Sequence, residues 1–117
     1  MGLRDRLRQL STSTDEMHAR SIAHQLVALD VTHLSDVEPR CHVRVAGEVT
    51  RIRTRPATGV PVLEVRISDG GSNATVEWNG RQTIGGVTLG RRILIEGVAR
   101  RDGRRLIFAN PEYTLLA

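Results

Sequence analysis

The sequence predicts a mainly β protein: a small closed barrel of five strands that follows a short N-terminal helical segment. Two observations lead to this prediction. Strand-like alternation runs into a glycine twice, at residues 43–47 and 93–97, and a further apolar residue, Val49 or Val98, follows closely. Because glycine weakens an ordinary strand, two at matching places indicate strands that coil sharply around a small barrel. In addition, five strand-like stretches fit into residues 40–117.

The N-terminal residues predict two short helices. Residues 3–10 place three leucines on one side of a helical turn. Ser13 and Glu16 have the spacing of a capping box, so a second helix is expected to begin there and to run to about Leu29. Its moderately apolar side includes Ile22. We expect this side to dock on the barrel, with a partner protein as the alternative.

Polar and acidic residues and a proline at residues 30–39 are typical of a linker. The predicted domains are therefore residues 1–38, a helical segment with its linker, and residues 39–117, the barrel. The two parts differ in charge. Residues 1–39 hold four arginines against six acids, whereas residues 40–117 hold thirteen arginines against seven acids, a balance of +6. A basic globular part favours a polyanionic partner.

The first three strands are expected at residues 42–55, 61–68 and 74–79. In the first strand the apolar alternation changes phase after Gly47, which indicates a bulge or a coil. Alternation in the second strand places Leu63 and its alternate neighbours in the core. The third strand aligns its apolar residues on one face in the same way.

The last two strands are expected at residues 91–101 and 104–110, and Pro111 ends the second of them. Asp102 and Gly103 between them predict a two-residue hairpin of type I′. Residues 80–90 are too short and too rich in glycine for a proper helix. Five short strands within this length match an OB-fold, a Greek-key barrel that often binds oligonucleotides.

Residues 43–113 also resemble a known family, the OB-fold nucleic-acid-binding domain of the tRNA-anticodon type, which is also found in the wedge domain of the RecG helicase. The whole chain is similar to small actinobacterial OB-fold proteins. The resemblance implies the fold and a nucleic-acid ligand, and no ATPase motif accompanies it. The matching stretches are residues 43–49, 63–70, 74–78, 90–97 and 110–113.

An OB-fold presents its ligand to the outer face of strands two and three, between the loops after strands one and four. No aromatic residue lies on that face, on which the alternation places Val62, Glu64, Arg66, Thr75, Glu77 and Asn79. Trp78 has the alternation of a core residue, and a contact with nucleic acid is the alternative. Stacking on aromatic rings contributes about 1–3 kcal/mol per base in such sites, so tight single-strand binding is in doubt.

Arginine is the remaining means of binding a polyanion. All 17 basic residues are arginine, whose planar cation forms bidentate contacts with phosphate. One cluster alternates at the end of the first strand, and another brackets the last hairpin. Such clusters favour salt-sensitive, sequence-tolerant binding, whereas a solvated surface that keeps sheet edges soluble is the alternative. Arginines that are scattered, or paired with neighbouring carboxylates, would remove the case for a polynucleotide ligand and leave only the architecture. The candidate contacts are Arg51, Arg53, Arg55, Arg66, Trp78, Arg100, Arg101, Arg104 and Arg105.

Other classes of protein have little support. Cys41 is the only cysteine, which excludes an internal disulfide, and its alternation with Val43 predicts a buried thiol. The four histidines lack metal-ligand spacing, and no catalytic arrangement or cofactor motif is present, so we expect neither an enzyme nor a metal or cofactor site. No apolar stretch approaches a membrane span, and a cytoplasmic location is expected.

Two functions follow from these patterns. The first is a sequence-tolerant module for single-stranded or branched DNA, with RNA as the other polymer, that binds through arginine-rich loops. The second is a protein-interaction module that uses the barrel or the N-terminal helix. Self-association through the helices is a third outcome.

Overall fold

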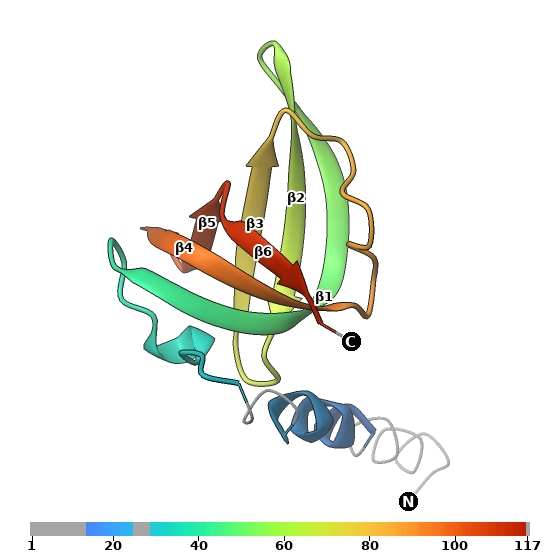
Figure 1. Cartoon of the computed structure of the whole chain (residues 1–117), viewed down its shortest axis with the longest axis vertical. Helices are drawn as coiled ribbons and strands as arrows, with labels where there is room; N and C mark the ends of the chain where they lie inside the picture. Colours follow the sequence, from blue (N-terminus) through green and yellow to red (C-terminus); the bar gives the residue numbers. More distant parts are fainter. Residues whose placement is uncertain (1–13, 25–28, 117) are drawn as a thin grey trace, which may run out of the picture.

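The computed structural model describes residues 14–24 and 29–116, and it has the predicted mainly β architecture (Figure 1). Residues 14–24 are helical, so the described part of the second predicted helix is present, while the helix expected at residues 3–10 lies outside the described residues. No helix within the described ranges has the length and apolar run needed to cross a bilayer. The labelled elements are η1 Leu34–Asp36, β1 His42–Ala57, β2 Val60–Ser68, β3 Asn73–Asn79, β4 Arg92–Asp102, β5 Arg105–Ala109 and β6 Glu112–Leu115.

Five strands form the closed barrel. The order in the sheet is β1-β2-β3-β5-β4-β6, and an additional pairing of β1 with β4 closes the ring. Strands β3 and β5 are parallel, whereas the other pairs are antiparallel. The sixth strand, β6, was not predicted. It pairs with the first part of β4, before the residues that pair with β5, and places Tyr113 opposite Ile95. Its four residues are too few to show a clear strand pattern in the sequence.

Both predicted glycine positions are places of close approach. A Cβ atom on Gly47 would lie 2.9 Å from the carbonyl oxygen of Ser68, and one on Gly97 would lie 3.2 Å from Cβ of Pro111. The bulge in β1 falls at Thr50, since the register with β2 shifts between Val49 and Arg51. The predicted phase change is therefore present, three residues later than Gly47. It turns the second half of β1 away from β4 and onto β2.

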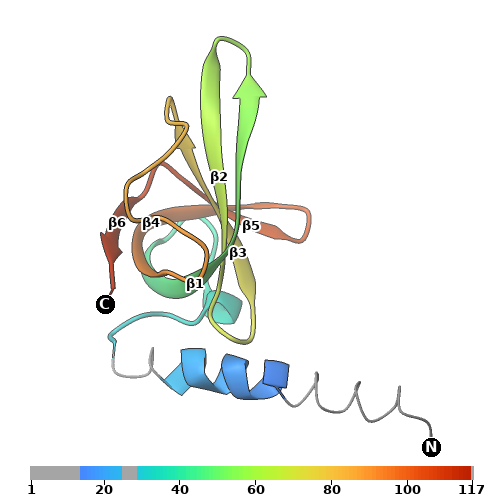
Figure 2. The same cartoon turned by 90° about the vertical axis from the view of Figure 1, so that its right-hand side faces the viewer.

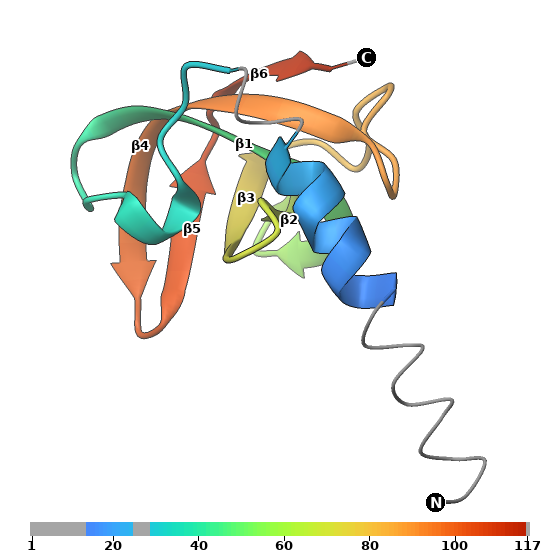
Figure 3. The same cartoon turned by 90° about the horizontal axis from the view of Figure 1, so that it is seen from below.

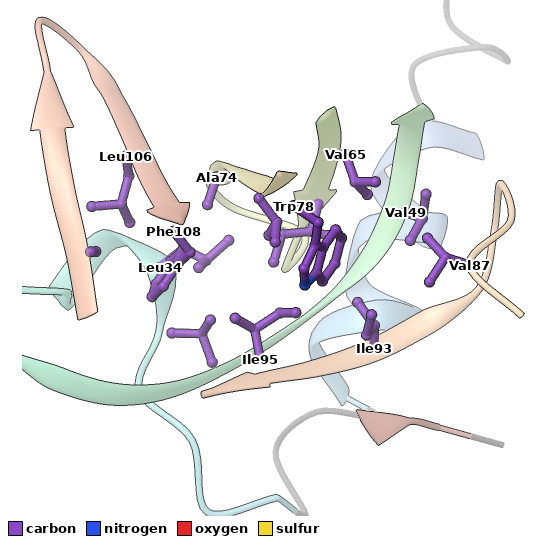
Figure 4. Packing of buried hydrophobic residues seen from close by; sticks show 14 of the residues in the cluster. Leu34, Val49, Val65, Ala74, Trp78, Val87, Ile93, Ile95, Leu106 and Phe108 are labelled. Atoms are coloured by element: carbon purple, nitrogen blue, oxygen red, sulfur yellow. The ribbon is translucent and has the colours of Figure 1, made fainter. Parts of the chain in front are cut away.

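The core fills the barrel with inward side chains from every strand of the ring (Figure 4). Leu34 and Val37, from the segment expected to be a linker, belong to this core and are 2% and 3% exposed. Ile22 of the helix instead packs with Ala46 of β1 in a separate cluster. The helix thus docks on the outside of the barrel, as expected, while the segment around η1 covers its end (Figure 3).

Two local predictions were wrong. Cys41 is exposed, because the backbone turns at Arg40, which has a φ of 71°, and β1 begins only at His42. In the β4–β5 hairpin the central residues are Gly103 and Arg104, since Asp102 pairs with Arg105. Of these two, only Gly103 has a positive φ, 63°, which is the pattern of a type II′ turn rather than type I′.

Candidate functional site

The strand register collects six arginines on the outer face of the barrel. Arg51 is directly opposite Arg66, and Arg53 is opposite Glu64. Directly opposed residues project to the same side of a sheet. The side that carries Glu64 therefore also carries Glu77 of β3, which is opposite it. It continues to Arg105 and Ile107 of β5 and to Arg100 of β4. We call this surface the arginine face. It lies between the projecting β1–β2 and β4–β5 hairpins (Figure 2). Its arginines are Arg51, Arg53, Arg55, Arg66, Arg100 and Arg105.

Glu64 and Glu77 stand opposite each other at the centre of the face. Glu64 forms ion pairs with three arginines: its Oε2 lies 3.3 Å from Nη2 of Arg53 and 3.7 Å from Nε of Arg55, and its Oε1 lies 3.6 Å from Nη2 of Arg105. Glu77 forms two more, with Oε1 at 3.4 Å from Nη2 of Arg55 and Oε2 at 3.6 Å from Nη2 of Arg100. One network therefore joins β1, β2, β3, β4 and β5.

The two carboxylates lie beneath the cations. The side chains of Glu64 and Glu77 are 15% and 11% exposed, whereas their four arginine partners are 48–55% exposed. Ile107 also points to this face and is 1% exposed, so the long side chains around it cover it. Since half-exposed ion pairs contribute only about 0–1 kcal/mol each, the network orients the guanidinium groups more than it stabilises the barrel.

The pairing meets, in part, the condition that argues against a polynucleotide ligand. Four of the six arginines share two carboxylates, while Arg51 and Arg66 have no carboxylate within 4.0 Å among the described residues. Counting Glu64, Glu77 and Asp102 on the same face leaves a net charge of +3. Alternation along the strands predicted both glutamates on this face, but their role as ion-pair partners depends on the register across three strands.

Two candidate arginines lie away from the arginine face. Arg101 is opposite Leu106, whose side chain is in the core, so Arg101 projects on the other side of the β4–β5 hairpin. Arg104 is a central residue of the turn itself. The four arginines predicted as one cluster around this hairpin therefore lie in two places: Arg100 and Arg105 belong to the arginine face, and the other two do not.

Trp78 does not lie on the arginine face and has the core position that its alternation predicts. It is 6% exposed and points into the barrel (Figure 4). Its Nε1–H donates a hydrogen bond to the carbonyl oxygen of Pro111 at 3.2 Å. Its ring meets Tyr113 edge-on, with centroids 5.6 Å apart at an interplanar angle of 77°. The tryptophan thus attaches β6 to the barrel.

Residues that could hold a metal ion do not gather in the described part of the chain, where no group of three or more His, Cys, Asp or Glu side chains is close enough. The ion pairs give the site the chemistry of arginine cations over two largely buried carboxylates. Such an arrangement can bind an anion by charge-assisted hydrogen bonds.

Comparison with solved structures supports the fold described above. No protein-family model and no curated protein matches the chain. The barrel is similar to part of RecG in a structure of RecG bound to a three-way DNA junction, with 20% sequence identity and a TM-score of 0.63. The match covers 73% of this chain and 12% of the RecG chain. The closed barrel of five strands is compatible with the OB-fold that the sequence predicts.

Proposed function

We propose that the protein is a nucleic-acid-binding module that holds single-stranded or branched DNA by its phosphate backbone, through the arginine face. The observation that carries the proposal is the convergence of six arginines from four strands on one continuous outer surface. This is the surface that an OB-fold uses for its ligand.

The ion pairs leave donors for phosphate. A guanidinium group has five N–H donors in a fixed fork. Arg100 and Arg105 each meet a glutamate through Nη2 alone. Because the glutamates lie underneath, the remaining N–H groups of these half-exposed side chains are available to a ligand that approaches from solvent. Holding the cations in place beforehand also lowers the entropy that is lost when the ligand binds.

The choice of branched or single-stranded DNA draws on the fold comparison. The solved RecG structure holds a three-way DNA junction, and the present chain shares the fold of part of it. Transfer of that ligand to this chain is our proposal. Its arginine face has no aromatic ring among the described residues. We therefore propose backbone binding with little preference for base sequence.

The proposal predicts how steeply the binding constant for DNA falls with salt concentration. A protein that neutralises Z phosphates on a single strand has a slope of about −0.7Z in log K against log salt. With a net charge of +3, the arginine face accounts for a slope of about −2.

The test compares two charge-matched double variants in the full chain, Arg53→Gln/Arg55→Gln on the arginine face and Arg44→Gln/Arg91→Gln away from it. Arg44 and Arg91 are exposed and have no ion pair among the described residues. Fluorescence anisotropy would follow labelled single-stranded DNA, a three-way junction, duplex DNA and RNA in about 50 mM salt. We expect the face variant to lose at least tenfold in affinity and the control to lose much less. Equal losses would refute a role for this face.

A protein-interaction module is the second candidate. The observation that favours it is the pairing of four face arginines with glutamates, which lowers their attraction for a polyanion. If wild-type protein binds no nucleic acid in about 50 mM salt and a pull-down recovers a specific protein, this candidate replaces the first.

A further inference from the structure

A slot opens where two strands of the barrel separate. Strands β3 and β5 pair only from Thr75 opposite Ile107 to Glu77 opposite Ala109. Before Thr75 the two strands diverge, and two cavities lie beside the gap between them. The first, of about 230 Å³, lies between Arg66 and Thr75 on one side and Arg105 on the other, next to the arginine face. The second, of about 310 Å³, reaches Ser35 of η1.

The two cavities are neighbours, since Asn73, Arg104 and Leu106 line both of them. Their lining residues extend from Arg66 and Arg105 on the arginine face, past the β4–β5 turn, to Ser35 of η1. Figure 3 shows η1 beside the β4–β5 hairpin at this end of the barrel. We call these two neighbouring cavities together the β3–β5 slot.

In the part of the chain that the structure describes, the charged residues that line the slot are all arginines. Arg101 lines the second cavity and Arg104 lines both, while Arg66 and Arg105 line the first. Of these, Arg105 alone has an ion pair within the described residues, with Glu64 at 3.6 Å. The slot thus differs from the arginine face, where carboxylates lie under the cations. Ser35, Ser72 and Asn73 add hydroxyl and amide groups that can donate hydrogen bonds.

The nearest turn does not place a carboxylate in the slot. Asp69 lines neither of the two cavities. Its Oδ1 accepts hydrogen bonds from the backbone N–H groups of Gly71 and Ser72, at 3.0 and 2.8 Å, and its Oδ2 accepts one from Leu34 at 2.9 Å. These bonds tie the β2–β3 turn to η1 and give the polar wall of the slot a fixed position.

We propose that the β3–β5 slot is a phosphate subsite, which takes one backbone phosphate of a nucleic-acid strand that lies on the arginine face. The inference rests on the proposed function and extends it. Within the described residues Arg101 and Arg104 have no carboxylate within 4.0 Å. Guanidinium groups form bidentate hydrogen bonds with phosphate oxygens. Leu106, 4% exposed, and Ala74, 3% exposed, form an apolar floor that lowers the local dielectric and strengthens the contact.

The experiment uses the full chain with Arg101→Gln/Arg104→Gln and the charge-matched control Arg44→Gln/Arg91→Gln. All four arginines are exposed, so both variants are expected to fold, which circular dichroism would check. A labelled oligonucleotide of about twelve thymidines covers the arginine face and the slot. We expect the slot variant to lose about tenfold in affinity near 50 mM salt and to have a slope less steep by about 0.7. Equal effects in slot variant and control would overturn the slot.

A second arm separates the slot from the proposed function. Inorganic phosphate is titrated into the protein while amide resonances of Ser72 and Asn73 are followed by NMR. We expect saturable shifts in the wild type that the slot variant lacks. If the wild type binds no oligonucleotide, the proposed function fails, and saturable phosphate shifts still support the slot as an anion site. Absence of saturable shifts together with unchanged oligonucleotide binding in the slot variant would overturn the inference.

Discussion

Arg55 on β1 and Glu77 on β3 form an ion pair, with Nη2 3.4 Å from Oε1, although β2 lies between their strands. Adjacent strands lie about 4.8 Å apart, so the two side chains and the contact between them together span two strand spacings, about 10 Å. Glu77 also meets Arg100 of β4 at 3.6 Å. A single buried carboxylate therefore connects arginines that come from the β1–β2 hairpin and from the β4–β5 hairpin.

The first prediction concerns these carboxylates. Replacing both by Glu64→Gln/Glu77→Gln removes two negative charges from beneath the arginine face and retains side chains of the same shape. We expect tighter binding of single-stranded DNA, by about tenfold at low salt, since two more phosphates can be neutralised. Anisotropy with a labelled oligonucleotide measures the change.

Glu96→Gln/Glu112→Gln is the matched control, because these two glutamates lie opposite each other on β4 and β6, away from the arginine face. It should change affinity much less. Weaker binding by Glu64→Gln/Glu77→Gln would contradict this prediction. It would mean that loss of the ion pairs, which position the arginines, outweighs the gain in positive charge.

The second prediction concerns Trp78. The substitution Trp78→Phe retains an aromatic core residue and removes the hydrogen bond from Nε1 to the carbonyl oxygen of Pro111. We expect the free energy of unfolding to fall by about 1–2 kcal/mol, from the lost bond and the smaller ring, with binding to nucleic acid unchanged. Urea denaturation and anisotropy measure the two effects. A large loss of binding in a folded variant would return Trp78 to the contact residues.

The third prediction tests the coiling of β1. In Gly47→Ala the new Cβ atom would lie 2.9 Å from a backbone oxygen of Ser68 and 3.1 Å from Cβ of Ile67, neither of which can move cheaply. We expect a loss of about 1–3 kcal/mol in the free energy of unfolding. Gly85→Ala is the control, since nothing lies within 4 Å of its added Cβ atom. Equal stabilities of the two variants would contradict the close approach of β1 and β2.

The fourth prediction concerns the segment before β1. Leu34→Ala should cost about 2–5 kcal/mol in the free energy of unfolding, because the side chain is 2% exposed in the main core. Ser35→Ala, at the exposed neighbour, should cost little. Thermal unfolding compares the two. A small effect at Leu34 would restore the prediction that residues 30–39 are only a linker.

The strands could be predicted from the sequence because alternation and glycine placement are local signals. All five barrel strands were expected within two residues of their observed ends. The linker prediction missed Leu34 and Val37, since two apolar residues in a polar segment carry no period that marks them as core. The strand β6 was missed because it forms only by pairing with β4, and a pairing between distant segments leaves no local pattern in the sequence.

The site was only partly predictable for the same reason. Alternation grouped Arg51, Arg53 and Arg55 correctly. Placing Glu64 and Glu77 among them requires the register across β1, β2 and β3, which depends on the bulge at Thr50. Treating the β4–β5 arginines as one cluster ignored that successive residues of a strand face opposite sides, which separates Arg101 from Arg100.

The most direct test of the arginine face is the salt dependence of DNA binding in three forms of the protein, measured by anisotropy with one oligonucleotide. Relative to the wild type, we predict a slope less steep by about 1.4 in Arg53→Gln/Arg55→Gln and steeper by about 1.4 in Glu64→Gln/Glu77→Gln. Equal slopes in all three forms, or a wild type that binds no DNA at about 50 mM salt, would contradict the account.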